Sequence, residues 1–259
     1  MPSNRTPSSS RLGGLLWTLV RTDFKSRYHG TAGGFIWALM KPVAMFLVLS
    51  GVFSFIFVSD PQYRLRLLIG LFLFDFFSES TRAGLMALHA KGFLLSKVHV
   101  PSWILVVASQ ANAVITLSIF LVMITTFQSL TDRPPTPVGL AFFLLYLVCF
   151  AVIILGFSLA SSALFLRYRD LNQVWDVVIQ AGFFLAPVVY PLRVIPLEYH
   201  FYMYLWPPTA IIEFSRAVLI DGTVPTFKAH ALLLFECAVL LGVGAAFFRR
   251  LAPRAAEYL

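Results

Sequence analysis

Three ionisable residues stand inside a long apolar run, at a spacing that could support chemistry. Asp75, Glu79 and Arg82 are four and three residues apart, so a helix would place all three on one face. Two carboxylates beside a guanidinium could carry a proton or an ion, or form a structural cluster in which Arg82 neutralises one carboxylate. Charges inside a membrane are costly and usually face protein or water. We favour the structural ion cluster and keep a transport role as the alternative.

The sequence holds no familiar motif for phosphate binding, metal binding or nucleophilic catalysis. It contains no G-x-x-x-x-G-K-[ST], H-E-x-x-H, C-x-x-C or G-x-S-x-G pattern. The five histidines are scattered, and the two cysteines, Cys149 and Cys237, each lie in an apolar run. We therefore assign no catalytic, metal-binding or cofactor-binding residue to this chain, and we expect that it is not an enzyme.

The composition is that of a membrane protein. Of the 259 residues, 59% are hydrophobic and 12% are charged, the latter about half the usual share. A soluble domain of this size could not bury so much apolar surface. The net charge of +8 comes from basic residues that flank apolar runs, so we expect no nucleic acid partner.

Six apolar runs are candidates to cross a bilayer, which requires roughly 20 mostly apolar residues. We therefore expect an all-α polytopic membrane protein with a six-helix transmembrane domain in residues 35–259. A cytoplasmic tail and interface helix in residues 1–34 would precede it. The predicted spans are Phe35–Val58, Leu65–Leu88, Trp103–Phe127, Val138–Leu166, Val174–Tyr190 and Phe227–Phe248.

Basic residues and the first apolar stripe indicate how the chain lies in the membrane. Lys and Arg are about twice as frequent in the segments that would be cytoplasmic if both termini were inside, so we expect this orientation. Residues 12–28 carry apolar side chains at helical spacing, with Arg21 and Lys25 beside them. This pattern predicts an amphipathic helix against the lipid headgroups. The alternative is a basic leader that only sets the topology.

The inner segment between the second and third spans, residues 89–101, is too polar to span and too apolar for a simple solvated loop. Phe93 and Leu94 could form one face of a short cytoplasmic helix, with Lys91 and Lys97 in solvent. A helix of this kind would dock a cytoplasmic partner. The alternative is the frayed end of the second span followed by a turn.

The segment after the fifth span is rich in proline. Residues 199–220 have the length of a span but contain Pro207, Pro208, Glu213 and Arg216, which a lipid-facing helix would not tolerate. Both flanks of this segment are on the outer side if there are six spans. We therefore predict a pair of short re-entrant helices that dip in from outside and are buried in protein. A surface-lying aromatic loop is the alternative.

Two sets of aromatic and polar residues could line a path for amphipathic cargo. One follows a helical stripe in the first span, and the other lies in the fifth span. A sugar chain needs such polar partners because each unsatisfied hydroxyl is costly in lipid. Ordinary helix packing explains the same spacing, so both interpretations stay open. The predicted lining residues are Phe46, Ser50, Phe53, Phe57, Gln180, Phe183 and Phe184.

Three stretches resemble the membrane subunits of ABC-2-type exporters, in particular those that export lipid-linked polysaccharides such as O antigens. They are Leu19–Pro42, Leu94–Pro101 and Arg167–Pro196, the last followed by Leu205–Gly222. Their order, the six expected spans and the lack of an ATPase motif support a resemblance over about residues 12–250. One departure is Pro207, where the family usually has Asn.

The resemblance implies a permease without a cofactor of its own. It implies a homodimer in the bacterial inner membrane, two copies of a separate ABC ATPase that binds ATP and Mg²⁺, and a lipid-linked polysaccharide as cargo. It also implies that inner segments meet the ATPase and that the re-entrant helices gate the outer exit. The expected coupling residues are Lys91, Phe93, Leu94, Lys97, Pro101, Arg169 and Asp170. The expected outer-gate residues are Pro187, Tyr190, Pro191, Trp206, Pro207, Pro208 and Arg216.

Other functions are open on the sequence alone. Within the same class, the cargo could be teichoic acid, capsule or a drug. In a different class, the chain could be a membrane-embedded transferase acting on polyprenyl-linked sugars, with Asp75 and Glu79 as catalytic carboxylates. The position of this pair in mid-span beside Arg82 argues against the transferase. A passive scaffold or channel is a third class.

Overall fold

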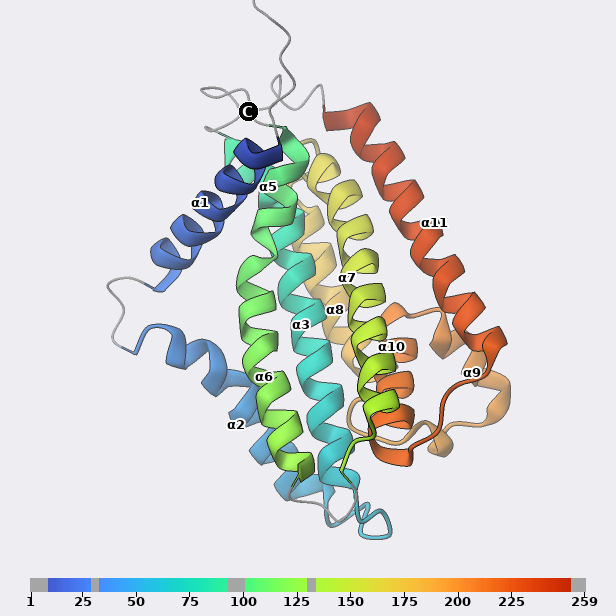
Figure 1. Ribbon diagram of the computed structural model, residues 1–259. Coiled ribbons are helices and arrows are strands. Elements are labelled where there is room, and N and C mark those ends of the chain that lie inside the picture. Colours follow the sequence, from blue (N-terminus) through green and yellow to red (C-terminus); the bar gives the residue numbers. More distant parts are fainter. Residues whose placement is uncertain (1–8, 29–32, 93–100, 130–133, 253–259) are drawn as a thin grey trace, which may run out of the picture.

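Figure 1 shows the computed structural model of the chain, in which long helices form a bundle. The structure describes residues 9–28, 33–92, 101–129 and 134–252, and all regular structure within these ranges is helical. The long helices are α1 (Ser9–Tyr28), α2 (Phe35–Phe53), α3 (Tyr63–Ala90), α6 (Ala111–Ser129), α7 (Pro137–Phe165), α8 (Leu171–Leu185) and α11 (Phe227–Leu251). The short ones are α5 (Ser102–Ser109), α9 (Leu197–Tyr204) and α10 (Pro207–Arg216). A 3-10 turn (Leu192–Val194) precedes α9, and a π-helical turn (Ala217–Asp221) follows α10.

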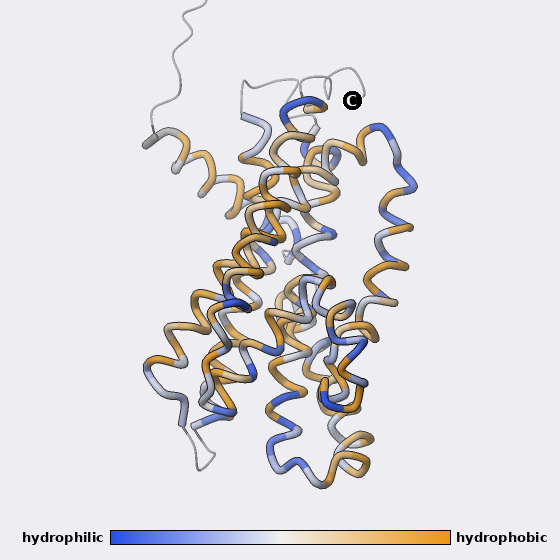
Figure 2. Tube along the Cα trace, turned by 90° about the vertical axis from the view of Figure 1, so that its right-hand side faces the viewer, coloured by the Kyte–Doolittle hydropathy of each residue, from blue (hydrophilic) through white to orange (hydrophobic). Residues whose placement is uncertain are grey.

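The bundle has two distinct ends. Helix α1 and the C-terminal ends of α3 and α11 lie at the upper end in Figure 1, which we call the α1 end. Helices α9 and α10 lie in the opposite half, whose end we call the α10 end. Figure 2 shows long hydrophobic stretches along the helices, with hydrophilic residues near the turns and at a few interior positions. This distribution is typical of a bundle whose sides face lipid.

Among the described residues, four helical stretches are long and apolar enough to cross a membrane. They are α2, the α5–α6 pair over Ser102–Ser129, α7 and α11. These four match the first, third, fourth and sixth predicted spans. Helix α3 coincides with the second predicted span and is 28 residues long, but its charged residues keep it out of this group.

Helix α8 matches the fifth predicted span only in part. It has 15 residues, so it is about 22 Å long, less than the roughly 30 Å of a bilayer's hydrocarbon core. The helix ends at Leu185 because Ala186 is extended ahead of Pro187, as residues before proline usually are. The predicted span to Tyr190 was therefore too long. The first predicted span was also too long, since α2 ends at Phe53 and not at Val58.

Helix α3 forms the centre of the bundle. It packs against α2, α5, α6, α7, α8 and α10. Its apolar side chains, such as Leu67 and Leu73, are completely buried. Aromatic rings join it to its neighbours: Phe72 stacks on Phe120 of α6 with centroids 4.0 Å apart. Most side chains of α3 are buried, and its charged residues Glu79 and Arg82 pair with residues of other helices.

Small residues let α7 and α11 pack closely. A Cβ atom on Gly156 of α7 would lie 2.6 Å from the backbone of Leu240 on α11, so only glycine fits there. Close approach of this kind is a common way to hold helices together in lipid, where the hydrophobic effect gives no drive to associate. Helix α11 makes its main contacts with α7, so its other sides are open.

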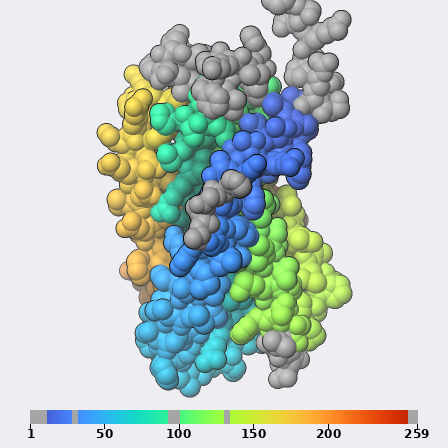
Figure 3. Space-filling model, turned by 90° about the vertical axis from the view of Figure 1, so that its left-hand side faces the viewer, coloured from blue at the N-terminus to red at the C-terminus, as the bar shows by residue number. Residues whose placement is uncertain are grey.

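The predicted amphipathic helix forms as α1, and its apolar stripe has a protein neighbour. Leu19 is buried, and Leu12, Leu16 and Val20 pack with it against a cluster that includes residues of α5 and the end of α3. Trp17 is exposed on the other side. Figure 3 shows α1 and α2 on the surface of the same face, one above the other. The division of the chain at residue 34 stays a prediction, as does the position of α1 at a membrane surface.

Candidate transport site

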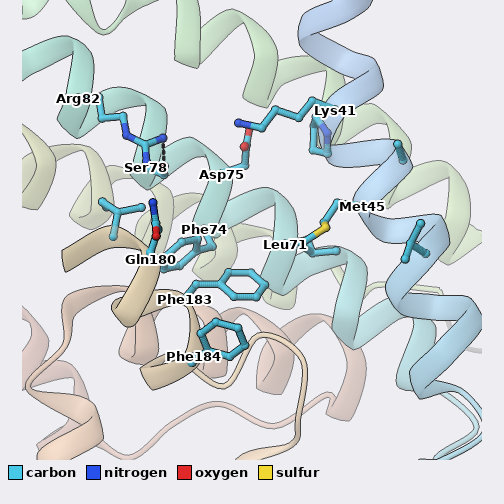
Figure 4. Close-up of a pocket in the computed structure, with 14 residues that line it drawn as sticks. Lys41, Met45, Leu71, Phe74, Asp75, Ser78, Arg82, Gln180, Phe183 and Phe184 are labelled. Carbon is cyan, nitrogen blue, oxygen red and sulfur yellow. Dashed lines mark hydrogen bonds between the residues drawn. The ribbon is translucent and has the colours of Figure 1, made fainter. Parts of the chain in front are cut away.

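Helices α2, α3 and α8 enclose a groove of 710 Å³, shown in Figure 4. We call it the α2–α8 groove. Helix α2 contributes Lys41, Pro42, Ala44, Met45 and Val48, and helix α3 contributes Leu71, Phe74, Asp75, Ser78 and Arg82. Helix α8 contributes Ile179, Gln180, Phe183 and Phe184. Apolar side chains dominate the half near Phe184, and the charged residues gather in the other half.

The charged half of the groove continues toward α1. A second cavity of 390 Å³ shares Lys41, Asp75 and Arg82 with the groove and adds Glu79 of α3 and Arg27 of α1. The two cavities together form one surface that changes from charged at the α1 end to aromatic nearer the α10 end. An amphipathic molecule would find a polar and an apolar region side by side here.

The carboxylates of this region pair with cations from other helices. Arg82 donates from Nε to Asp176 Oδ1 of α8 over 2.6 Å and from Nη1 to Ser78 Oγ over 3.1 Å. Arg27 of α1 lies 2.6 Å from Glu79, measured from Nη1 to Oε1. The expectation that Arg82 neutralises a carboxylate of its own helix was wrong, because Asp176 of α8 lies within its reach.

Asp75 is the carboxylate of α3 that has no ion pair within the part of the chain that the structure describes. Figure 4 shows Asp75 and Lys41 of α2 pointing toward each other across the groove. Lys41 lies on the wall of the groove. Arg27 comes from α1, so the spacing of residues within α3 could not identify it as the partner of Glu79.

The structure brings together one of the two predicted sets of lining residues. Gln180, Phe183 and Phe184 of α8 all line the groove. Phe183 also meets Phe74 edge-on, with centroids 5.3 Å apart. Phe184 is 72% exposed, so its ring is available to a ligand.

The other predicted set lies on a different side of α2. Phe46, Phe53 and Phe57 pack against the core around α3, and Ser50 is buried. None of these four side chains lines the α2–α8 groove. Apart from Lys41 and Ser50, α2 is apolar all the way round, so its hydrophobic pattern could not reveal which side would pack.

The predicted outer-gate residues lie together between α8 and α10. Pro187, Pro191 and Trp206 belong to the segment that links these helices and includes the 3-10 turn and α9. The Tyr190 hydroxyl donates to the Phe184 carbonyl over 2.8 Å. The Trp206 ring covers Gly182 of α8 so closely that a Cβ there would collide with it. These contacts tie the linker to the end of α8.

Helices α9 and α10 differ in burial. The α10 residues Pro208, Thr209 and Ile211 are buried, and the helix packs between α3 and α7. The α9 residues Phe201 and Tyr202 are 63% and 64% exposed. Pro207 takes the first position of α10, where a helix does not use its N–H, so proline fits there without distortion.

Arg216 is the best-connected side chain of this region. It is 3% exposed and donates to the carbonyls of Pro187 over 2.5 Å, Val188 over 3.0 Å and Arg66 over 2.7 Å. It also pairs with Glu213 Oε1 over 2.8 Å. Arg216 therefore joins α10 to the linker after α8 and to α3.

Four of the seven expected coupling residues are described, and all four lie at the α1 end. Arg169 and Asp170 are exposed at the turn between α7 and α8, and Pro101 is the N-cap of α5. Lys91 was expected in solvent, but it is buried and its Nζ pairs with Asp23 Oδ2 of α1. Phe93, Leu94 and Lys97 lie outside the described residues.

Comparison with known proteins shows the class of protein that this fold and site belong to. The model of the ABC-2 type transporter family matches residues 14–220. The chain therefore belongs to the ABC-2 type transporter family, and the resemblance of its three stretches is confirmed. As a transport protein of this family it is a permease and not an enzyme, which leaves the transferase hypothesis without support.

Curated relatives cover nearly the whole chain. The O-antigen export system permease protein RfbA of Myxococcus xanthus is 27% identical over 258 residues, covering 94% of this chain and 95% of the relative. The protein of the same name from Klebsiella pneumoniae is 23% identical, with 95% of each chain covered. The polysialic acid transport protein KpsM of Escherichia coli is 22% identical, with 89% of this chain and 91% of the relative covered.

Proposed function

We propose that this chain is the membrane subunit of an ATP-driven exporter that moves a lipid-linked polysaccharide of the O-antigen type across the bacterial inner membrane. The names of its curated relatives support this cargo. The observation that carries the proposal is the α2–α8 groove, which offers aromatic faces and charged groups on one continuous surface. A separate ABC ATPase would bind ATP and Mg²⁺, since this sequence has no phosphate-binding loop.

The proposed topology has six crossings with both termini in the cytoplasm. The crossings are α2, α3, α5 with α6, α7, α8 and α11, and the α1 end faces the cytoplasm. Helix α8 is too short to cross by itself. The buried helix α10 packs between α3 and α7, in the same half of the bundle as the end of α8. These features support α9 and α10 as the re-entrant pair on the outer side.

The proposed assembly is a homodimer in which two α2 helices meet. Only 6% of the most apolar 18-residue window of α2 is buried within one chain. Its exposed side chains include Leu47 at 63% and Val48 at 61%, and Val48 also lines the groove. A second copy related by a two-fold axis would cover this side and turn two open grooves into a closed conduit. Phe46, Ser50, Phe53 and Phe57 remain candidates for contact with cargo if α2 rotates during transport.

The ATPase, in two copies, would dock at the α1 end. Arg169 and Asp170 are exposed there, and the predicted docking residues Phe93 and Leu94 follow the end of α3 in the sequence. Two ion pairs connect α1 to α3, one at Lys91 and one at Glu79. A displacement of α1 by the ATPase would therefore move the residues of the charged half of the groove through these ion pairs.

A transport assay tests this proposal. The chain and its ATPase would be reconstituted in inverted vesicles and supplied with an undecaprenyl-linked glycan that carries a fluorescent label. We expect that ATP protects the label from an external quencher, because transport moves the glycan into the vesicle. We expect no such protection with a hydrolysis-deficient ATPase. Transport of a teichoic acid precursor or a drug in place of the O-antigen glycan would contradict the proposed cargo and keep the proposed class.

A further inference from the structure

A second large cavity lies on the other side of the bundle from the α2–α8 groove. It has a volume of 530 Å³ and is bounded by α7, α8, α9 and α11, with Phe77 of α3 among its lining residues. This volume is in the range of small-molecule sites. The two cavities share no lining residue, because α3 and α8 present different sides to them. We call this cavity the Glu236 pocket.

Aromatic rings form the inner wall of the Glu236 pocket. Phe157 of α7 stacks on Trp175 of α8, with centroids 4.1 Å apart and an interplanar angle of 28°. Trp206 packs edge-on against Phe77 at 5.5 Å and lies 6.3 Å from Trp175. Each ring holds the next, so the wall is formed in advance and does not have to collapse around a ligand.

Among the described residues, Glu236 is the one charged residue that lines this pocket. It lies near the middle of α11, and no residue in the described part of the chain forms an ion pair or hydrogen bond with it. A carboxylate in apolar surroundings is costly unless a cation or a donor meets it. An ionisable residue at membrane depth indicates a functional site whose partner must be found. Within the described residues Glu236 has no such partner, so a ligand can take this place.

The pocket opens sideways between α9 and α11. Phe201 of α9 and Leu205, which follows α9, are each 63% exposed, and Leu232 and Phe235 of α11 are 56% and 67% exposed. Helix α11 packs mainly on α7 and α9 mainly on α10, so the two helices stand apart at this mouth. In a bilayer these apolar side chains would face lipid, and a ligand would enter from the membrane and not from water.

We propose that the Glu236 pocket binds a lipophilic organic cation that reaches it from the bilayer. The faces of Trp and Tyr rings attract cations, and this attraction grows when water is excluded. The carboxylate of Glu236 supplies the counter-ion, and the apolar mouth selects a hydrophobic body. A sugar suits this pocket less well than the groove, because Glu236 is the one charged group described here, whereas the groove offers Lys41, Asp75, Ser78, Arg82 and Gln180. The site is therefore separate from the path proposed for the polysaccharide.

Two ions of the same shape and opposite charge test the proposal. Tetraphenylphosphonium and tetraphenylborate would be measured by equilibrium dialysis against the full-length protein in phosphatidylcholine nanodiscs, with empty nanodiscs subtracted. We expect saturable binding of the phosphonium and none of the borate. Glu236→Gln should weaken phosphonium binding about tenfold or more, since it removes the charge and keeps the shape. Glu198→Gln, which removes an exposed carboxylate of α9, should leave binding unchanged.

Val239→Trp provides a second variant that leaves Glu236 in place. Val239 lines the pocket and is 42% exposed, so a larger side chain there should fill the mouth and block the phosphonium. Equal binding of the two ions, or unchanged phosphonium binding in Glu236→Gln, would overturn the proposal. Loss of phosphonium binding in nanodiscs that contain phosphatidylethanolamine would also overturn it, because the occupant would then be a lipid amine and not a free cation.

Discussion

Arg216 is a buried guanidinium whose hydrogen bonds go mainly to backbone carbonyls. Its acceptors lie in three separate segments, which are α10 at Glu213, the linker at Pro187 and Val188, and α3 at Arg66. The planar fork of arginine can serve all of them at once, whereas the ammonium of lysine cannot match this geometry. At the residue scale, this side chain therefore decides whether the proposed outer gate keeps its shape.

We predict that Arg216→Lys destabilises the protein strongly. Leaving a buried carbonyl acceptor unpaired costs about 1–3 kcal/mol. For a chain of this size each kcal/mol corresponds to about 2–4 °C in Tm. Thermal unfolding of the detergent-solubilised protein measures the shift. Arg193→Lys is the control, since Arg193 has a side chain that is 65% exposed and lies 3.7 Å from Asp60. Equal Tm values for the two variants would refute the role of Arg216.

Gly70→Ala should disturb the same contacts from the opposite side. A Cβ atom there would lie 2.5 Å from Arg216 Nη2 and 3.3 Å from the backbone of Val188, so the guanidinium would have to move. We expect a lower Tm and faster proteolysis of the linker between α8 and α10. Gly51→Ala is the matched control on α2, because nothing lies within 4 Å of its Cβ and alanine favours helix. A Gly70→Ala protein as stable as Gly51→Ala would count against the proposed role of the Arg216 hydrogen bonds.

At the scale of elements, the joint between α1 and α3 carries the proposed coupling. The ion pair of Lys91 with Asp23 is well covered, with side chains 11% and 25% exposed. We predict that Asp23→Asn lowers transport by about tenfold, which corresponds to about 1.4 kcal/mol of coupling. Such a variant should still assemble with the ATPase.

A variant with the two charges exchanged distinguishes loss of the ion pair from a general loss of folding. Asp23→Lys combined with Lys91→Asp restores opposite charges at the same places, so it should recover much of the transport that either single change loses. ATP hydrolysis and glycan transport would be measured in the same vesicles. If Asp23→Asn transports at the wild-type rate, the pair is only structural.

Sequence patterns predicted helices better than they predicted helix neighbours. Length and hydropathy located α2, α7 and α11, because bilayer thickness fixes how many apolar residues a span needs. The spacing of Asp75, Glu79 and Arg82 placed them on one helix face, but it could not reveal Asp176 or Arg27, which come from other helices. The end of α8 was missed by five residues, because an apolar stretch that continues past a helix still reads as a span.

The same limit applies to the candidate site. The α8 half of the groove was predicted because Gln180 interrupts an otherwise apolar stretch beside two phenylalanines. The α2 half was missed because α2 is apolar on every side except at Lys41 and Ser50, and its packing is decided by the surface of α3 and not by its own pattern. Arg216 was noted for its charge, while its backbone partners depend on the tertiary fold.

At the scale of the whole molecule, a single chain leaves the α2–α8 groove open. Helix α2 has a single substantial neighbour, α3, and most of its surface is uncovered. We predict that Leu47→Cys, in a protein whose own two cysteines are replaced by serine, forms a disulfide-linked dimer on mild oxidation. Val148→Cys is the control, since it is 61% exposed on α7. Gel electrophoresis without reductant measures the dimer, and cross-linking through Val148 alone would contradict the proposed interface.

The central claim is that the lipid-linked glycan passes along the α2–α8 groove. The most direct measurement is photo-cross-linking in cells that make the polysaccharide, with a benzophenone amino acid placed at Met45, at Phe183 or at Val148. We predict adducts with the glycan at Met45 and Phe183 that require an active ATPase, and none at Val148, which lies outside the groove. Export with adducts at Val148 and none at Met45 or Phe183 would contradict the account.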